Sequence, residues 1–188
     1  MNLPEIHPIH TMENHPPGTP RAGLLGSVFG VLVLRLWLGV RTFLSGLEKY
    51  AGSSTSTTDV VIDGSVNTYG LTEATSSKVY GLANYHGIPP ALYDKFLAEP
   101  LLPEFALKIY GQVLGPALLA TGLALLLGLA TRFTLLAMGL IYTSLTVGLV
   151  LINENSGVAW LGIHIALVAL MLFHADDNRF ELTGKWKI

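Results

Sequence analysis

The sequence predicts an all-α membrane protein: an antiparallel bundle of four transmembrane helices, with a small hairpin-and-helix cap between the first two. Three observations support this prediction. Apolar residues gather in four blocks, at about 24–46, 106–129, 133–152 and 158–174, each near the ~20 residues that an α-helix needs to cross a bilayer. The chain is 51% hydrophobic and only 13% charged, which is a membrane composition. The connections at 130–132 and 153–157 are short, and short connections make neighbouring helices antiparallel.

Composition also excludes several classes of function. The formal net charge is −2, so we expect no nucleic-acid partner. The chain has no cysteine, which excludes disulfides, iron–sulfur clusters and cysteine-bound zinc within it. Only His164 lies well inside a predicted span, whereas bis-histidine haem needs two such histidines. We therefore predict neither metal nor haem.

The segment 1–20 contains five prolines and three histidines. Such a composition cannot pack a core, so we interpret it as a proline-rich cytoplasmic tail, resting against a partner subunit or the protein's own polar face. Residues 21–188 then form the four-helix membrane domain. Because this polar segment precedes the first span, we expect that span to be retained and not cleaved as a signal sequence.

The first span contains two arginines, in the stretch VLRLWLGVRTFLSGLEKY. At 100° per residue, Arg35, Thr42 and Lys49 nearly superpose, and Arg41 begins a second polar stripe beside them. A central arginine costs about 2.5–3.5 kcal/mol on insertion scales. The wedge is therefore predicted to face the bundle interior or a wet cavity.

The outer loop at 51–105 is long enough to have structure of its own. Asp63-Gly64 between two β-prone runs predicts a hairpin with a type I′ turn. IPPALYDKFLAE predicts a short helix that begins at Pro89-Pro90 and lies at the membrane surface. Basic residues fall on the other side of the membrane, so the positive-inside rule places both termini in the cytoplasm and the loop outside. These basic residues are Arg21, Arg132, Arg179, Lys185 and Lys187.

Glycine and proline patterns mark the spans. The pairs Gly26/Gly30 and Gly111/Gly115 are small-xxx-small motifs that allow helices to approach closely. Pro116 is expected to kink the second span and to free backbone carbonyls there. That kink is where we expect a site.

Helix rise predicts that four polar side chains lie at one level in the outer half of the bundle: Arg41, Gln112, Thr146 and His164, with Arg35 deeper. Together they would offer hydrogen-bond donors to an anion or to a quinone carbonyl. Structural explanations stay open. Either arginine can bond carbonyls freed by Pro116 or pair with Glu48. His164 can be a packing residue, and Gln112 and Thr146 can hold neighbouring helices together.

Three stretches together resemble the DoxX/DoxD family of four-helix membrane proteins: RLWLGVRTFLSGLEKY, GLALLLGLATR at 122–132 and ADDNRFEL at 175–182. The loop helix PALYDKFL is similar to the DoxD type, the large membrane subunit of thiosulfate:quinone oxidoreductase. The resemblance implies a membrane redox role. The matching positions are Arg35, Gly46, Lys49, Gly128, Arg132, Asp177 and Asn178. One departure is that many members carry an acidic residue a turn before the glycine at Gly122, where this chain has the apolar Leu118.

We therefore predict a DoxD-like subunit that passes electrons from a small donor such as thiosulfate to quinone, the suspected cofactor. Its expected partners are the lipid bilayer and other subunits, either a small DoxA-like protein or a larger redox complex, in a prokaryotic cytoplasmic membrane. The alternative is a non-catalytic subunit that braces a larger complex. A solute transporter is a third and weaker hypothesis, because the chain shows no inverted repeat. The predicted catalytic residues are Arg41, His164 and Arg35, and the predicted cofactor-binding residues are Gln112, Thr146 and Lys49.

Overall fold

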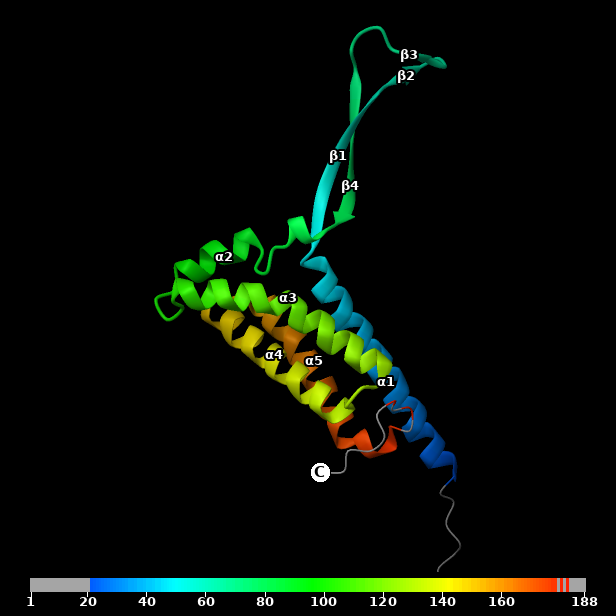
Figure 1. The fold of residues 1–188 in the computed structure, drawn as a ribbon, viewed down its shortest axis with the longest axis vertical. Coiled ribbons are helices and arrows are strands. Elements are labelled where there is room, and N and C mark those ends of the chain that lie inside the picture. Colours follow the sequence, from blue (N-terminus) through cyan, green and yellow to red (C-terminus); the bar gives the residue numbers. More distant parts are fainter. Residues whose placement is uncertain (1–20, 179, 181, 183–188) are drawn as a thin grey trace, which may run out of the picture.

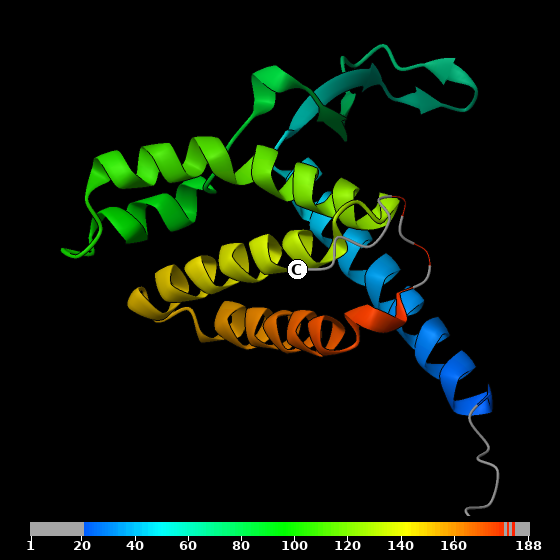
Figure 2. The same ribbon diagram turned by 60° about the horizontal axis from the view of Figure 1, so that its bottom comes forward.

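The computed structural model describes residues 21–178, 180 and 182. Its main elements are four long helices: α1 (Arg21–Glu48), α3 (Glu104–Leu127), α4 (Thr131–Leu151) and α5 (Asn155–Phe173), which pack side by side (Figures 1 and 2). Each is long and apolar enough to cross a membrane. The prediction of a helical membrane protein is confirmed at this level. The predicted tail at 1–20 lies outside the described residues.

A β-hairpin follows α1. Strand β1 (Ala51–Asp59) pairs antiparallel with β4 (Thr72–Tyr80), and the short strands β2 (Val61–Ile62) and β3 (Ser65–Val66) form its tip. The two tip residues between β2 and β3 both have positive φ, 52° for Asp63 and 82° for Gly64, as a type I′ turn requires. The predicted hairpin is therefore present, and Figure 1 shows it projecting away from the helices.

A connecting segment leads from the hairpin back to the bundle. It contains the one-turn helix η1 (Leu82–Asn84) and the helix α2 (Pro90–Leu97), which begins with proline as predicted. Both ribbon views show α2 lying beside the first half of α3 (Figures 1 and 2). We call this end of the bundle, where α1 ends and α3 begins, the hairpin end.

Helices α1 and α3 approach each other closely at two glycines. A Cβ atom added to Gly122 would lie 2.4 Å from the backbone nitrogen of Phe43, and one added to Gly46 would lie 2.8 Å from that of Leu119. Neither glycine belongs to the pairs that the sequence singled out. Both Gly26 and Gly30 have open space around them. The second pair faces the connecting segment: an added Cβ on Gly111 meets Ile88, and one on Gly115 meets Tyr85.

Pro116 interrupts α3, and Tyr85 of the connecting segment fills the interruption. Proline has no N–H, so the carbonyl of Gln112 loses its partner within the helix. The Tyr85 hydroxyl lies 3.1 Å from this carbonyl and 2.5 Å from that of Gly111, and it also accepts the backbone N–H of Gly115 at 3.1 Å. The expected freed carbonyl is thus used to anchor the connecting segment and does not face a cavity.

The opposite end of the bundle, which we call the tail end, is closed by the chain after α5. A one-turn helix, η2 (Ala175–Asp177), turns this segment back toward the α3–α4 connection, where the backbone N–H of Leu182 donates to the carbonyl of Gly128. Arg132 pairs with Asp176 at 2.5 Å, and Ser27 of α1 bonds Asp177. Polar contacts therefore bind this segment to α1, to α4 and to the α3–α4 connection.

Candidate functional site

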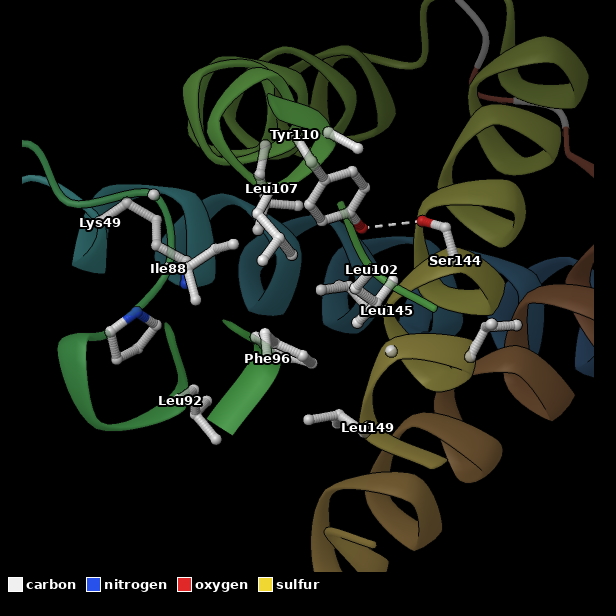
Figure 3. A pocket seen from close by; sticks show the side chains of 16 residues that line it. Lys49, Ile88, Leu92, Phe96, Leu102, Leu107, Tyr110, Ser144, Leu145 and Leu149 are labelled. Atoms are coloured by element: carbon white, nitrogen blue, oxygen red, sulfur yellow. Dashed lines mark hydrogen bonds between the residues drawn. The ribbon is translucent and has the colours of Figure 1, made fainter. Parts of the chain in front are cut away.

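A cavity of about 290 Å³ lies between α2, α3 and α4 at the hairpin end (Figure 3). Its walls are almost entirely apolar. Leu92 and Phe96 come from α2, Leu107 and Leu114 from α3, and Leu145 and Leu149 from α4. Ligand sites in proteins are concave, mostly apolar and carry a few well-placed polar groups. We call this space the α2 cavity.

Two polar groups on α3 and α4 meet at one wall of the α2 cavity. The hydroxyl oxygens of Tyr110 and Ser144 lie 2.8 Å apart, as the dashed line in Figure 3 shows. Ser144 also donates to the carbonyl of Ile141 at 2.7 Å. With its proton used there, Ser144 accepts from Tyr110, and the phenol oxygen keeps lone pairs that can accept a hydrogen bond.

Lys49 supplies the charged group of the α2 cavity. It follows directly after α1, and Figure 3 shows its side chain reaching toward Ile88 of the connecting segment. Burial lowers the pKa of its ammonium group, because a charge loses solvation near apolar walls. Within the described residues no carboxylate lies close enough to form an ion pair with Lys49. This ammonium therefore has donors to offer a ligand.

The other side chains predicted to share one level do not meet. Arg41 and Gln112 are exposed on the outside of the bundle. Thr146 is half-buried, and its hydroxyl donates to the carbonyl of Tyr142 in its own helix at 2.8 Å. Across the described part of the chain, no hydrogen bond, ion pair or ring contact joins any two of Arg41, Gln112, Thr146 and His164. Of the six predicted site residues, only Lys49 lines the α2 cavity.

His164 lies instead in a buried polar cluster at mid-bundle. It is 7% exposed, and its Nδ1 is 2.8 Å from the carbonyl oxygen of Trp160. A carbonyl only accepts, so Nδ1 carries a proton there. The imidazole ring meets the Tyr142 ring edge-on with centroids 5.7 Å apart, and the Tyr142 hydroxyl lies 2.5 Å from that of Thr42 on α1. This cluster joins α1, α4 and α5 across the bundle.

Arg35 faces the bundle interior, as predicted, but at the tail end and far from the α2 cavity. It is 6% exposed, and its Nη1 donates to Asn178 Oδ1 at 3.1 Å and to the carbonyl of Phe180 at 2.5 Å. Asn178 in turn donates to the hydroxyl of Thr131 at 3.0 Å. These contacts give Arg35 a structural role in binding the C-terminal segment.

The fold and the cavity together define a class: a helical membrane protein with an apolar, lysine-bearing cavity at one end of its helices. Comparisons of the chain with protein-family models, with curated proteins and with solved structures found no match. The resemblance to the DoxX/DoxD family accordingly stays a prediction that rests on the three stretches quoted above.

Proposed function

We propose that this protein is the DoxD-like membrane subunit of a redox complex, and that the α2 cavity binds the quinone which accepts electrons from a small donor such as thiosulfate. The observation that carries the proposal is the pairing of an apolar space of about 290 Å³ with one unpaired ammonium group, that of Lys49, among the described residues. The family resemblance supports it independently.

The residues present fit a quinone. A quinone ring and its isoprenoid tail are apolar, which suits leucine and phenylalanine walls, and ligand cavities commonly begin at roughly this volume. A carbonyl oxygen on the ring would accept a hydrogen bond from Lys49, and a hydroxyl on the reduced ring would donate to the oxygen of Tyr110. Bound quinone supplies the capacity to accept two electrons and two protons.

Lys49 has the further role of favouring reduction. Its positive charge lies next to apolar walls, where electrostatic interactions are stronger than in water. Electron density that develops on a neighbouring oxygen would be stabilised by this charge. The electron donor itself would be oxidised by a partner subunit, because the proposal assigns this chain only the quinone-binding part.

In the same proposal the four long helices cross a prokaryotic cytoplasmic membrane as an antiparallel bundle. The hairpin and α2 lie on the extracytoplasmic side as a cap, and both termini lie in the cytoplasm. By sequence, the segments assigned to the cytoplasm carry Arg21, Arg132, Arg179, Lys185 and Lys187, against Lys49, Lys78, Lys95 and Lys108 at the other end. The positive-inside rule assigns the arginine-bearing end to the cytoplasm.

The test is labelling by a photoreactive ubiquinone analogue in lipid nanodiscs. We expect the label in peptides that line the α2 cavity, competed by unlabelled quinone, and at least fivefold weaker binding for Lys49→Met. Lys108→Met is the matched control, because Lys108 is an exposed lysine of α3 outside the cavity. Quinone that labels only the lipid-facing surface, or binds Lys49→Met as tightly as wild type, would overturn the proposal.

A second function, that of a bracing subunit, is favoured by one specific observation. Arg41 lies within a helix that can cross the membrane, yet its side chain is exposed on the outside of the chain, where lipid would make it costly. A neighbouring subunit would provide a partner for it. Mild detergent purification followed by mass spectrometry separates the two functions: a large complex of fixed stoichiometry without quinone supports a brace.

A further inference from the structure

The α2 cavity lies between α2 and two of the four long helices, α3 and α4. Its α3 and α4 walls, from Ala106 to Leu114 and from Ser144 to Leu149, belong to two helices that are long and apolar enough to cross a membrane. At ~1.5 Å per residue, Leu114 lies about 15 Å from the start of α3. Exposed apolar side chains surround this region, among them Leu101, Phe105 and Val147. In the proposed orientation the cavity therefore lies just below the membrane surface on which α2 rests, with hydrocarbon against its exposed apolar sides.

Helix α2 closes one side of this space, and it is only lightly attached. It is eight residues long, and Phe96 is its one buried residue. Figure 3 shows the Phe96 ring between α2 and α4. The ring faces Gly148, where an added Cβ would lie 3.4 Å from a ring carbon. A short helix with a single buried side chain has the low local stability that is characteristic of moving elements.

One exposed ion pair adds to the attachment. Lys95 of α2 lies 3.2 Å from Glu154 in the α4–α5 connection, and both side chains are substantially exposed. Exposed pairs contribute at most about 1 kcal/mol, so this contact favours the closed position without locking it.

We infer that α2 is a lid which opens the cavity toward the bilayer, so that the ligand is a membrane-dissolved amphiphile that enters sideways past Phe96, and not a solute from water. This inference rests on the proposed function in one respect: quinone is the amphiphile named there. The apolar surroundings select a ligand that is dissolved in lipid. The Lys49 ammonium, at the wall beside Ile88, selects one with a polar, hydrogen-bond-accepting head.

The absence of natural cysteines makes a reversible tether the direct test. In the variant Lys95→Cys/Glu154→Cys, a short bis-methanethiosulfonate reagent would join α2 to the α4–α5 connection, and a reductant would release it. The matched control is Glu104→Cys/Lys108→Cys, which replaces another lysine–glutamate pair, 2.7 Å apart on α3, without restraining α2. Both variants lose the same charges and carry the same reagent.

The measurement is the rate at which a photoreactive ubiquinone analogue, added in vesicles, reaches the cavity of nanodisc-embedded protein. We expect the tether to slow labelling at least tenfold, the reductant to restore it, and the control tether to change it less than twofold. Phe96→Ala is expected to speed labelling severalfold, with Tyr93→Ala on the same helix as its control. Equal labelling rates with and without the α2 tether would contradict the inference that α2 opens to admit the ligand.

A parallel series with a photoreactive fatty acid separates this inference from the proposed function. In one outcome, the fatty acid labels the tethered protein slowly while quinone labels no form of the protein. That result would support the opening of α2 and reject quinone as the ligand. Failure of both probes to label the cavity in untethered protein would overturn the entry of any membrane-dissolved amphiphile.

Discussion

Arg35 on α1 donates a hydrogen bond to Asn178, 143 residues further along the chain, across 3.1 Å. The same guanidinium donates to the carbonyl of Phe180, and Asn178 donates to Thr131 at the start of α4. One buried arginine thus joins the first helix, the third long helix and the C-terminal segment. Its positive charge is used to hold the chain's two halves together at the tail end.

Removing this arginine should weaken the whole bundle. We expect Arg35→Met to lower the free energy of unfolding by about 1.5–3 kcal/mol, because hydrogen bonds to a charged group are lost and Asn178 stays buried. Asn178→Ala should have a similar effect, and the double variant should cost less than the sum of the two. Thermal unfolding in detergent provides the measurement. The control Arg132→Met breaks an exposed ion pair with Asp176 and should cost less than about 1 kcal/mol.

The hydroxyl of Tyr85 should matter more than its ring. Tyr85→Phe keeps the ring contact with Tyr50. It removes the hydroxyl group that hydrogen-bonds the backbone of α3 next to Pro116. We expect a loss of about 1–3 kcal/mol in unfolding free energy, since backbone groups beside Pro116 lose their partner. Tyr93→Phe on α2 is the control, with a change within about 0.5 kcal/mol. Equal stability of the two variants would contradict the role given to the hydroxyl.

The close approach of α1 and α3 predicts a contrast between two glycines. Gly122→Ala should destabilise by about 1–3 kcal/mol, because the new methyl group would meet the backbone of Phe43 and the helices would have to separate. Gly162→Ala on α5 introduces the same methyl group where nothing lies within 4 Å. It should leave stability unchanged or slightly raised, as alanine favours helix. Unfolding curves of the two variants, measured side by side, check the prediction.

Lys49 should make stability depend on alkaline pH. Its folded-state pKa is lowered by burial below the ordinary value of 10.5. Between these two pKa values the unfolded chain binds more protons than the folded one, so stability rises with pH through this window. Lys49→Met should therefore be more stable than wild type at neutral pH, and the difference should shrink as pH approaches 10.5.

Lys78 provides a control of opposite sign for this pH dependence. A hydrogen bond to Glu48 raises the pKa of Lys78 above 10.5, so its contribution is fully present below that pH and disappears as pH rises through the raised pKa. Lys78→Met should thus be slightly less stable than wild type at neutral pH. Melting temperatures measured from pH 7 to pH 11 separate the two behaviours, and a Lys49→Met variant that is less stable at pH 7 would contradict the assignment.

Local features of the fold were readable from the sequence because they follow from local physics. Four apolar blocks near 20 residues predict four long helices, and their predicted limits differ from the observed ones by three residues or fewer at each end. The turn at Asp63-Gly64 and the helix after Pro89 are also local, since they depend on backbone conformations that these residue types favour.

The residues that line the α2 cavity could not be predicted from local sequence patterns. Tyr110 and Ser144 stand out only as polar residues within apolar blocks, and nothing along the chain shows that they face each other. Equal depth was the basis for grouping Arg41 with His164, but depth leaves the rotation of each helix undetermined. Two side chains at one level can therefore differ in burial, as the exposed Arg41 and the buried His164 do.

The sequence by itself determined where the chain becomes helical and that it is apolar enough for a membrane, because hydrophobicity and turn chemistry act over a few residues. Only the tertiary structure decided that Arg35 binds the C-terminal segment, that Tyr85 enters the break at Pro116 and that Lys49 borders a cavity under α2. Each of these depends on contacts between residues distant along the chain. Such contacts are set by how the helices rotate and pack, and no local pattern encodes that rotation.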